Sequence, residues 1–169
     1  SGTESEPCNV DFSELCSAGG LATLPANISE SGISSYICVM PGTVLRDLYD
    51  NFGQRLLESN VRTFLQFRGK VNQGMKSTLL QNPENFFAYN NGLTVTASNI
   101  ELDDSSGQLI IKKLDNMQIV NGGQTTSAIY FSPLSKGKQQ GIDFRNIDLT
   151  KVFVQMKLTV IENYEESEI

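Results

Sequence analysis

The 169-residue chain contains no histidine. This absence excludes every mechanism that relies on a histidine base, including the Ser-His-Asp and Cys-His arrangements of nucleophilic catalysis. Any chemistry that the chain performs must therefore use carboxylates, lysine, tyrosine or a bound metal.

Cysteine is also scarce: the three cysteines, Cys8, Cys16 and Cys38, form no CxxC pair. An odd number of cysteines without paired spacing argues against a structural zinc site and against a disulfide framework. Free cysteines are typical of a reducing compartment, so we expect the protein to be cytoplasmic.

Long apolar runs are missing as well. No stretch approaches the ~20 apolar residues that a membrane-spanning helix needs, so we expect no contact with a membrane. Residues 1–7 are polar and acidic instead of a basic segment followed by an apolar one, so we expect no signal peptide.

Basic residues are outnumbered, because 13 Lys and Arg face 19 Asp and Glu and leave a formal net charge of −6. Non-specific affinity for nucleic acid comes mainly from basic residues that neutralise phosphates, so this balance argues against a broad electrostatic grip. Six of the acidic residues lie at the two ends: Glu4, Glu6, Glu162, Glu165, Glu166 and Glu168. The middle is close to neutral, which leaves open a local basic patch at Arg62, Arg68, Lys70 and Lys76.

Length and hydrophobic periodicity predict an α+β fold, a mixed β-sheet with a few short helices packed on it. We expect an irregular N-terminal segment over residues 1–35, a core domain over 36–161 and an acidic tail over 162–169. The expected elements are a strand at 36–40, a helix at 43–57 with Thr43 as its N-cap, a helix at 71–80, apolar runs at 86–89 and 93–97, a hairpin of strands 93–102 and 108–114, a strand at 117–120, a helix at 124–131, a polar surface excursion at 134–149 and a strand at 151–161.

The stretch 117–131 places Gly122 and Gly123 between a strand and a helix. A strand that turns sharply into a helix leaves the first helical N–H groups without partners, and such a helix start favours an anion. Neutral donors and acceptors surround that point: Asn121, Gln124, Thr125 and Thr126. The stretch therefore predicts a site for a polar or phosphorylated group.

The same stretch also fits an ordinary capped turn. Gly-Gly after a strand is often a tight turn, and Thr or Gln in the first helical turn is often a cap. The stretch lacks both the lysine of a Walker loop and the three-glycine spacing of a dinucleotide fingerprint, so neither motif applies. A ligand site and a structural turn both stay open.

Two further polar turns add candidates to this site, because turn tips on one edge of a sheet commonly build a binding site. The additional phosphate-binding candidates are Arg62, Asn72, Asn90, Asn91, Gly92 and Thr94. Each has a structural alternative: Asn72 fits a helix cap, Asn-Asn-Gly fits a hairpin tip, and Arg62 fits a surface ion pair.

Four blocks of sequence, taken in order, resemble one protein family. They are Asn60-Val61-Arg62 with Phe64-Leu65, Val71-Asn72 with Thr78-Leu79, residues 86–94, and residues 119–125. Over residues 36–161 the chain resembles the AIPR (abortive infection phage resistance) family. The resemblance implies a bacterial phage-defence protein, often encoded beside restriction-modification genes, for which no common reaction is established. Family members are several times longer, so it also implies that the core domain is truncated here.

A more distant likeness is to the ParB and sulfiredoxin type of fold, in which a strand end, a short helix, a β-turn and a strand-Gly-helix junction build a phosphate site. The corresponding pieces here would be residues 60–62, 71–80, 90–94 and 121–126. In those folds an arginine usually follows the glycine, where this chain has Gln124 and Thr125. The departure argues against a nucleoside triphosphate and for a weaker or differently charged ligand.

Three functions remain as hypotheses. The first is a phage-defence module that binds a nucleotide or a nucleic-acid phosphate at the strand-Gly-Gly-helix junction. The second is a metal-dependent nuclease or nucleotide hydrolase with Mg²⁺ as cofactor, although its candidate carboxylates have no recognisable metal spacing: Glu58, Glu84, Asp115 and Asp143. The third is a regulatory interaction domain without a ligand. Restriction-modification or other defence proteins are the expected partners.

Overall fold

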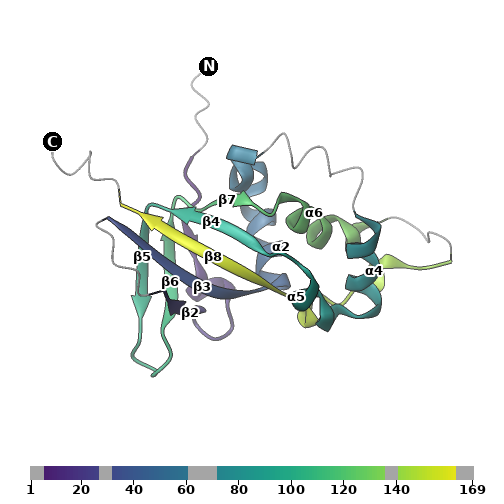
Figure 1. The fold of residues 1–169 in the computed structure, drawn as a ribbon, viewed down its shortest axis with the longest axis horizontal. Helices are drawn as coiled ribbons and strands as arrows, with labels where there is room; N and C mark the ends of the chain where they lie inside the picture. Colours follow the sequence, from purple (N-terminus) through teal and green to yellow (C-terminus); the bar gives the residue numbers. More distant parts are fainter. Residues whose placement is uncertain (1–5, 27–31, 61–71, 136–140, 163–169) are drawn as a thin grey trace, which may run out of the picture.

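The computed structural model describes residues 6–26, 32–60, 72–135 and 141–162. Its eight described strands form one curled sheet, and short helices pack on it (Figure 1). The strands are β1 (Val10–Asp11), β2 (Leu21–Pro25), β3 (Ile33–Pro41), β4 (Leu93–Ala97), β5 (Asn99–Asp103), β6 (Ile110–Asp115), β7 (Gln118–Asn121) and β8 (Phe153–Ile161). The predicted α+β class is confirmed.

The helices gather mainly at one end of the sheet, opposite the end from which β5 and β6 extend (Figure 1). They are α1 (Phe12–Leu15), α2 (Gly42–Phe52), α4 (Gln73–Gln81), α5 (Phe86–Tyr89) and α6 (Gly123–Phe131). The described residues also form 3-10 segments: η1 (Gly53–Asn60), η2 (Pro83–Asn85), η3 (Ser132–Leu134), η4 (Phe144–Asn146) and η5 (Leu149–Lys151). In the part of the chain that the structure describes, no helix has the length and apolarity to cross a membrane.

β8 lies inside the sheet, whose strand order is β1-β6-β2-β3-β8-β4-β7. It pairs antiparallel with the whole of β3 and parallel with the whole of β4. Its side chains alternate between buried and exposed, which agrees with the half-buried strand predicted over 151–161. The sheet is therefore mixed, and this interior strand comes from the end of the described chain.

β4–β5 and β6–β7 together form one long, bent hairpin. β5 pairs antiparallel with β6, and β4 pairs antiparallel with β7. Where β4 gives way to β5, the Ser98 N–H donates to the Asp115 carbonyl at 2.9 Å. The predicted hairpin is confirmed, except that its first strand bends at Ser98. Because β4 also borders β8, this bend curls the sheet.

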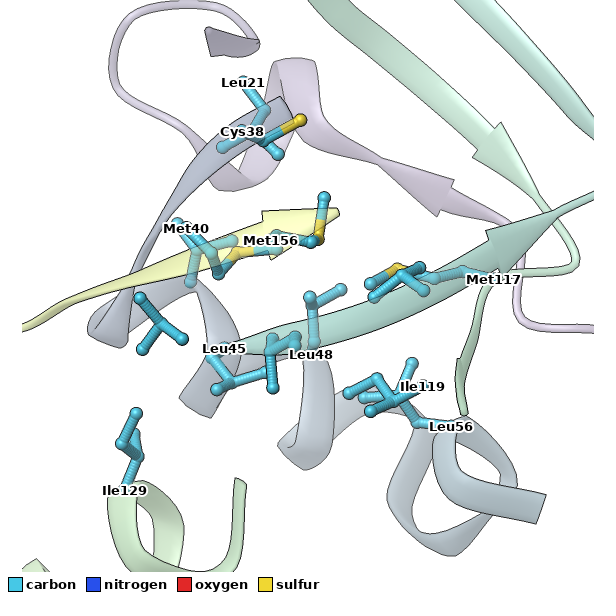
Figure 2. Close-up of a cluster of buried hydrophobic side chains, with 14 of the residues drawn as sticks. Leu21, Cys38, Met40, Leu45, Leu48, Leu56, Met117, Ile119, Ile129 and Met156 are labelled. Carbon is cyan, nitrogen blue, oxygen red and sulfur yellow. The ribbon is translucent and has the colours of Figure 1, made fainter. Parts of the chain in front are cut away.

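One apolar layer holds the helices against the sheet. Figure 2 shows side chains of α2, η1 and α6 meeting those of the strands. The labelled residues are all buried: Leu21, Cys38, Met40, Leu45, Leu48, Leu56, Met117, Ile119, Ile129 and Met156. Burying one large aliphatic side chain contributes about 1.5–3 kcal/mol, so this layer fixes α6, and with it the predicted junction, on the sheet.

The helix predicted over 43–57 is shorter than expected. α2 ends at Phe52 because Gly53 adopts φ 60°, a left-handed conformation that ends the helical hydrogen bonding. The helix begins at Gly42, with Pro41 as N-cap and without a side-chain capping bond. The prediction of Thr43 as the N-cap is therefore wrong.

Three other segments also differ from expectation. The described part of residues 1–35 contains β1, α1, β2 and the start of β3, so it is regular where an irregular segment was expected. Residues 86–89, for which only an apolar run was expected, form helix α5. The excursion predicted over 134–149 buries Phe144, Ile147 and Leu149, which anchor it to the core. The division at residues 35 and 161 stays a prediction.

Candidate functional site

The predicted junction of strand, glycines and helix is present between β7 and α6. Gly122 separates them in a left-handed conformation, with φ 113°. Its carbonyl accepts hydrogen bonds from the Thr126 N–H and from Thr126 Oγ1, both at 3.0 Å. These bonds close the first turn of α6. The N–H groups that precede Thr126 in the helix have no carbonyl partner within it, as at every helix start.

Two glycines bring the junction against the turn that leads from α5 into β4. A Cβ on Gly122 would lie 2.6 Å from Leu93 Cδ2 and 3.0 Å from the Gly92 carbonyl oxygen. A Cβ on Gly92, where φ is 83°, would overlap the Gln155 carbonyl oxygen of β8. Glycine is required at both positions for space and for backbone conformation. The Asn-Asn-Gly turn is therefore no hairpin tip but a support for the junction.

Asn90 ties this turn to the first turn of α6. Its Oδ1 accepts from the Gly92 N–H at 2.8 Å and from Thr125 Oγ1 at 3.0 Å. Asn72 also has a structural partner, since it is the N-cap of α4 and accepts from the Met75 N–H at 3.0 Å. The predicted cap at Asn72 is confirmed. These contacts build the frame of the site.

A hollow of about 240 Å³ opens at the junction. It brings together eight of the predicted site residues, which are residues 90–92 and 121–125. Asn72, Thr94 and Thr126 do not line it. Thr94 lies opposite Asn121 in the pairing of β4 with β7. Arg62 lies outside the described residues.

Three amide side chains on this wall have no protein partner in the part of the chain that is described: Asn91, Asn121 and Gln124. Asn91 and Asn121 are exposed, and Gln124 is half-buried. No charged side chain is among the described lining residues. The candidate site therefore divides into a bonded frame around Asn90 and a neutral polar surface that faces solvent.

The basic patch left open by the sequence does not include Lys76. This side chain is only 5% exposed, and its Nζ lies 4.2 Å from the centroid of the Phe144 ring. Burial lowers the pKa of its ammonium group. Arg62, Arg68 and Lys70 lie outside the described residues.

Sequence reasoning missed two residues that line the hollow, Met75 and Tyr89. Both also line an adjoining hollow of about 250 Å³ whose wall includes Phe86. The missed signal was the run Phe86–Tyr89. In a strand its first and last side chains point to opposite faces, whereas in helix α5 they lie one turn apart on the same side.

The carboxylates considered for a metal site are dispersed. Asp143 pairs with Arg145 at 2.8 Å, and Asp115 accepts from Asn99 Nδ2 at 3.3 Å. Neither these residues nor Glu84 lines the hollow, and the Glu58 side chain lies outside the described part. Among the residues described, no group of three or more His, Cys, Asp and Glu is placed to hold a metal ion.

The sheet, the helices and the junction define an α+β domain with a neutral polar hollow at a glycine-rich helix start. Residues 57–169, more than half of the chain, match the family model described as AIPR protein, and the chain belongs to this family. The match confirms the family predicted from the sequence and indicates an abortive-infection, phage-defence domain. No curated protein and no solved structure shows significant similarity to the chain. The likeness to the ParB and sulfiredoxin fold stays a prediction.

Proposed function

We propose that this phage-defence domain binds a nucleotide, or a single phosphate group of a nucleic acid, at the junction between β7 and α6. The observation that carries the proposal is the hollow at the start of α6, with Asn91, Asn121 and Gln124 on its wall. A helix N-terminus attracts an anion by roughly 0.3–1 kcal/mol, and by up to ~2 kcal/mol where it is partly buried. Backbone and amide N–H groups are donors for phosphate oxygens.

The lining residues that the structure describes carry no charge, and this limits the charge of the ligand. Hydrogen bonds to charged groups contribute about 1.5–3 kcal/mol each, and arginine forms such bonds in pairs. No arginine or lysine is among the described lining residues. A group with one phosphate suits this wall better than a triphosphate, whose charge needs several cations.

The rigidity of the frame supports the proposal. Asn90 forms hydrogen bonds to the turn before β4 and to the first turn of α6. The backbone at Gly92 and Gly122 is in close contact, so the two turns have no room to move closer. A ligand that enters this hollow finds the backbone of the two turns already ordered. The entropic cost of ~0.5–1.5 kcal/mol for each immobilised side chain is then confined to Asn91, Asn121 and Gln124.

Charge variants at Gln124 test the proposal. Gln124→Glu places a carboxylate at the helix start with almost no change of shape, and we expect it to weaken binding of a nucleoside monophosphate by about fivefold, or ~1 kcal/mol. Gln124→Lys should strengthen binding. Isothermal titration calorimetry on the full chain measures both. The exposed Gln108, between β5 and β6, provides the matched control Gln108→Glu, which changes the net charge equally away from the hollow.

Two results would contradict the proposal. One is an equal effect of Gln124→Glu and Gln108→Glu, because the helix start would then play no part. The other is the absence of binding to nucleoside monophosphates, inorganic phosphate and short oligonucleotides alike. That second outcome would favour an interaction domain, in which the amides serve only the fold.

A further inference from the structure

The hollow at the junction adjoins a second one with different chemistry. The two share Met75, Tyr89 and Asn90 in their walls. The first is lined by amides and by the backbone of the junction, whereas the second presents the apolar surfaces of Met75, Phe86 and Tyr89. A ligand that spans both must be polar at one end and apolar at the other.

The size of the two hollows also indicates a ligand that spans them. They measure about 240 and 250 Å³. Small-molecule sites usually enclose about 300–1,000 Å³, so each hollow alone is too small and the two together fall within that range.

Tyr89 stands at the border of the two hollows with an unusually exposed ring. It is 81% exposed, whereas Phe86, one helical turn earlier, is 2% exposed. Its backbone is nevertheless fixed, because it is the last residue of α5 and the Asn90 N–H donates to the Phe86 carbonyl at 3.0 Å. An exposed aromatic ring on a fixed backbone is a stacking surface for a flat ring, as in proteins that bind unpaired bases.

Asn90 supplies a polar atom beside this surface. Its Oδ1 is occupied within the frame, but its Nδ2 faces Met75 Sδ at 4.0 Å, and sulfur is a weak acceptor. No oxygen of a described residue accepts from Nδ2. This amide is therefore placed to donate to an acceptor on the edge of a base.

We propose that the second hollow holds the base of a nucleotide whose phosphate lies at the start of α6, with the base stacked on Tyr89 and in contact with Met75. This inference rests on the proposed function, since it takes the phosphate position from it. The ligand is one nucleotide unit, free or at a single position of a strand. The described lining residues carry no charge that would bind neighbouring phosphates of a strand, and this favours the free nucleotide.

The test compares ligands that have or lack a base. Isothermal titration calorimetry on the full chain uses the four ribonucleoside 5′-monophosphates, ribose 5-phosphate and a short single-stranded oligonucleotide. We expect at least one monophosphate to bind about tenfold more tightly than ribose 5-phosphate. Tyr89→Ala should weaken that monophosphate about tenfold and leave ribose 5-phosphate unchanged, and Tyr89→Phe should restore the affinity because it keeps the ring.

Phe87→Ala is the matched control, because Phe87 is the neighbouring exposed aromatic residue of α5 and lines neither hollow. It should leave all affinities unchanged, and urea unfolding of each variant checks that α5 remains folded. An oligonucleotide that binds no better than the monophosphate supports a free nucleotide, and tighter binding that grows with length supports a strand.

The base site and the phosphate site fail in different ways. Equal affinities for the monophosphates and ribose 5-phosphate, or an unchanged monophosphate affinity in Tyr89→Ala, would overturn the base site and leave the phosphate site standing. Absence of binding to all these ligands would overturn both.

Discussion

The hydrogen bond from Thr125 Oγ1 to Asn90 Oδ1 joins two turns that are 35 residues apart in sequence. Thr125→Val keeps the shape of this buried side chain and removes the donor. A typical intramolecular hydrogen bond contributes ~0.5–1.5 kcal/mol net, so we expect the free energy of unfolding to fall by about 1 kcal/mol. Asn90 Oδ1 would still accept from the Gly92 N–H at 2.8 Å, so no buried acceptor is left without a partner.

Asn90→Ala should cost more, because it removes the acceptor of two donors, the Thr125 hydroxyl and the Gly92 N–H. Leaving a buried donor unpaired costs ~1–3 kcal/mol, and we expect a total loss of about 2–3 kcal/mol. Each single variant removes the bond between Asn90 and Thr125, so the sum of the two single losses counts this bond twice, whereas the double variant of Thr125→Val and Asn90→Ala loses it only once. The double variant should therefore be about 1 kcal/mol more stable than the sum of the single losses predicts.

Urea unfolding followed by circular dichroism measures these free energies by linear extrapolation. Thr23→Val is the control, since Thr23 is also buried and its Oγ1 lies 3.1 Å from Cys38 Sγ, away from the junction in β2. Its effect should add to that of Asn90→Ala within ~0.5 kcal/mol. Additive effects of Thr125→Val and Asn90→Ala would refute the coupling of the two turns.

Two further predictions concern stability. Gly92→Ala should lower the free energy of unfolding more than Gly107→Ala. Both glycines have positive φ, 83° and 88°, but only at Gly92 would the new Cβ meet backbone atoms. Equal losses in urea unfolding would contradict this close approach of the turn before β4 to β8. Burial raises the pKa of the Cys38 thiol from about 9.0 to about 11, so the folded protein holds this proton more tightly than the unfolded chain does. The resulting contribution to the free energy of unfolding is complete below pH 9 and is lost as the pH rises toward 11. Cys38→Ala should flatten the fall in stability over that interval, and an unchanged slope would contradict the assignment.

The sequence predicted best those helices and strands whose apolar residues repeat at a constant spacing over many positions. β8 alternates between buried and exposed residues over its nine positions, and the α2 stripe repeats at helical spacing. It did not decide the structure of α5, because four apolar residues are too few to distinguish a helix from a strand. It also placed the end of α2 too late, since a glycine can be tolerated within a helix or can end it, and here the left-handed φ of Gly53 ends it.

The two turns that line the hollow were predicted from local signals, namely glycines and amides at a strand end. The separation of these residues into frame and surface was not predictable. It depends on the contact between Asn90 and Thr125, which only the tertiary fold creates. The exposure of Tyr89 was not predictable either, because it follows from where α5 lies against β8.

The position of β8 between β3 and β4 has a consequence for the order in which the protein can fold during its synthesis. β3 and β4 each pair with β8 and not with one another. β8 is nevertheless the last of the described strands to leave the ribosome. Until it emerges, two strands present unpaired edges, which are templates for association with other chains. A chain released before Phe153 would keep both edges open, so we expect premature termination to yield an aggregating product instead of a partly folded domain.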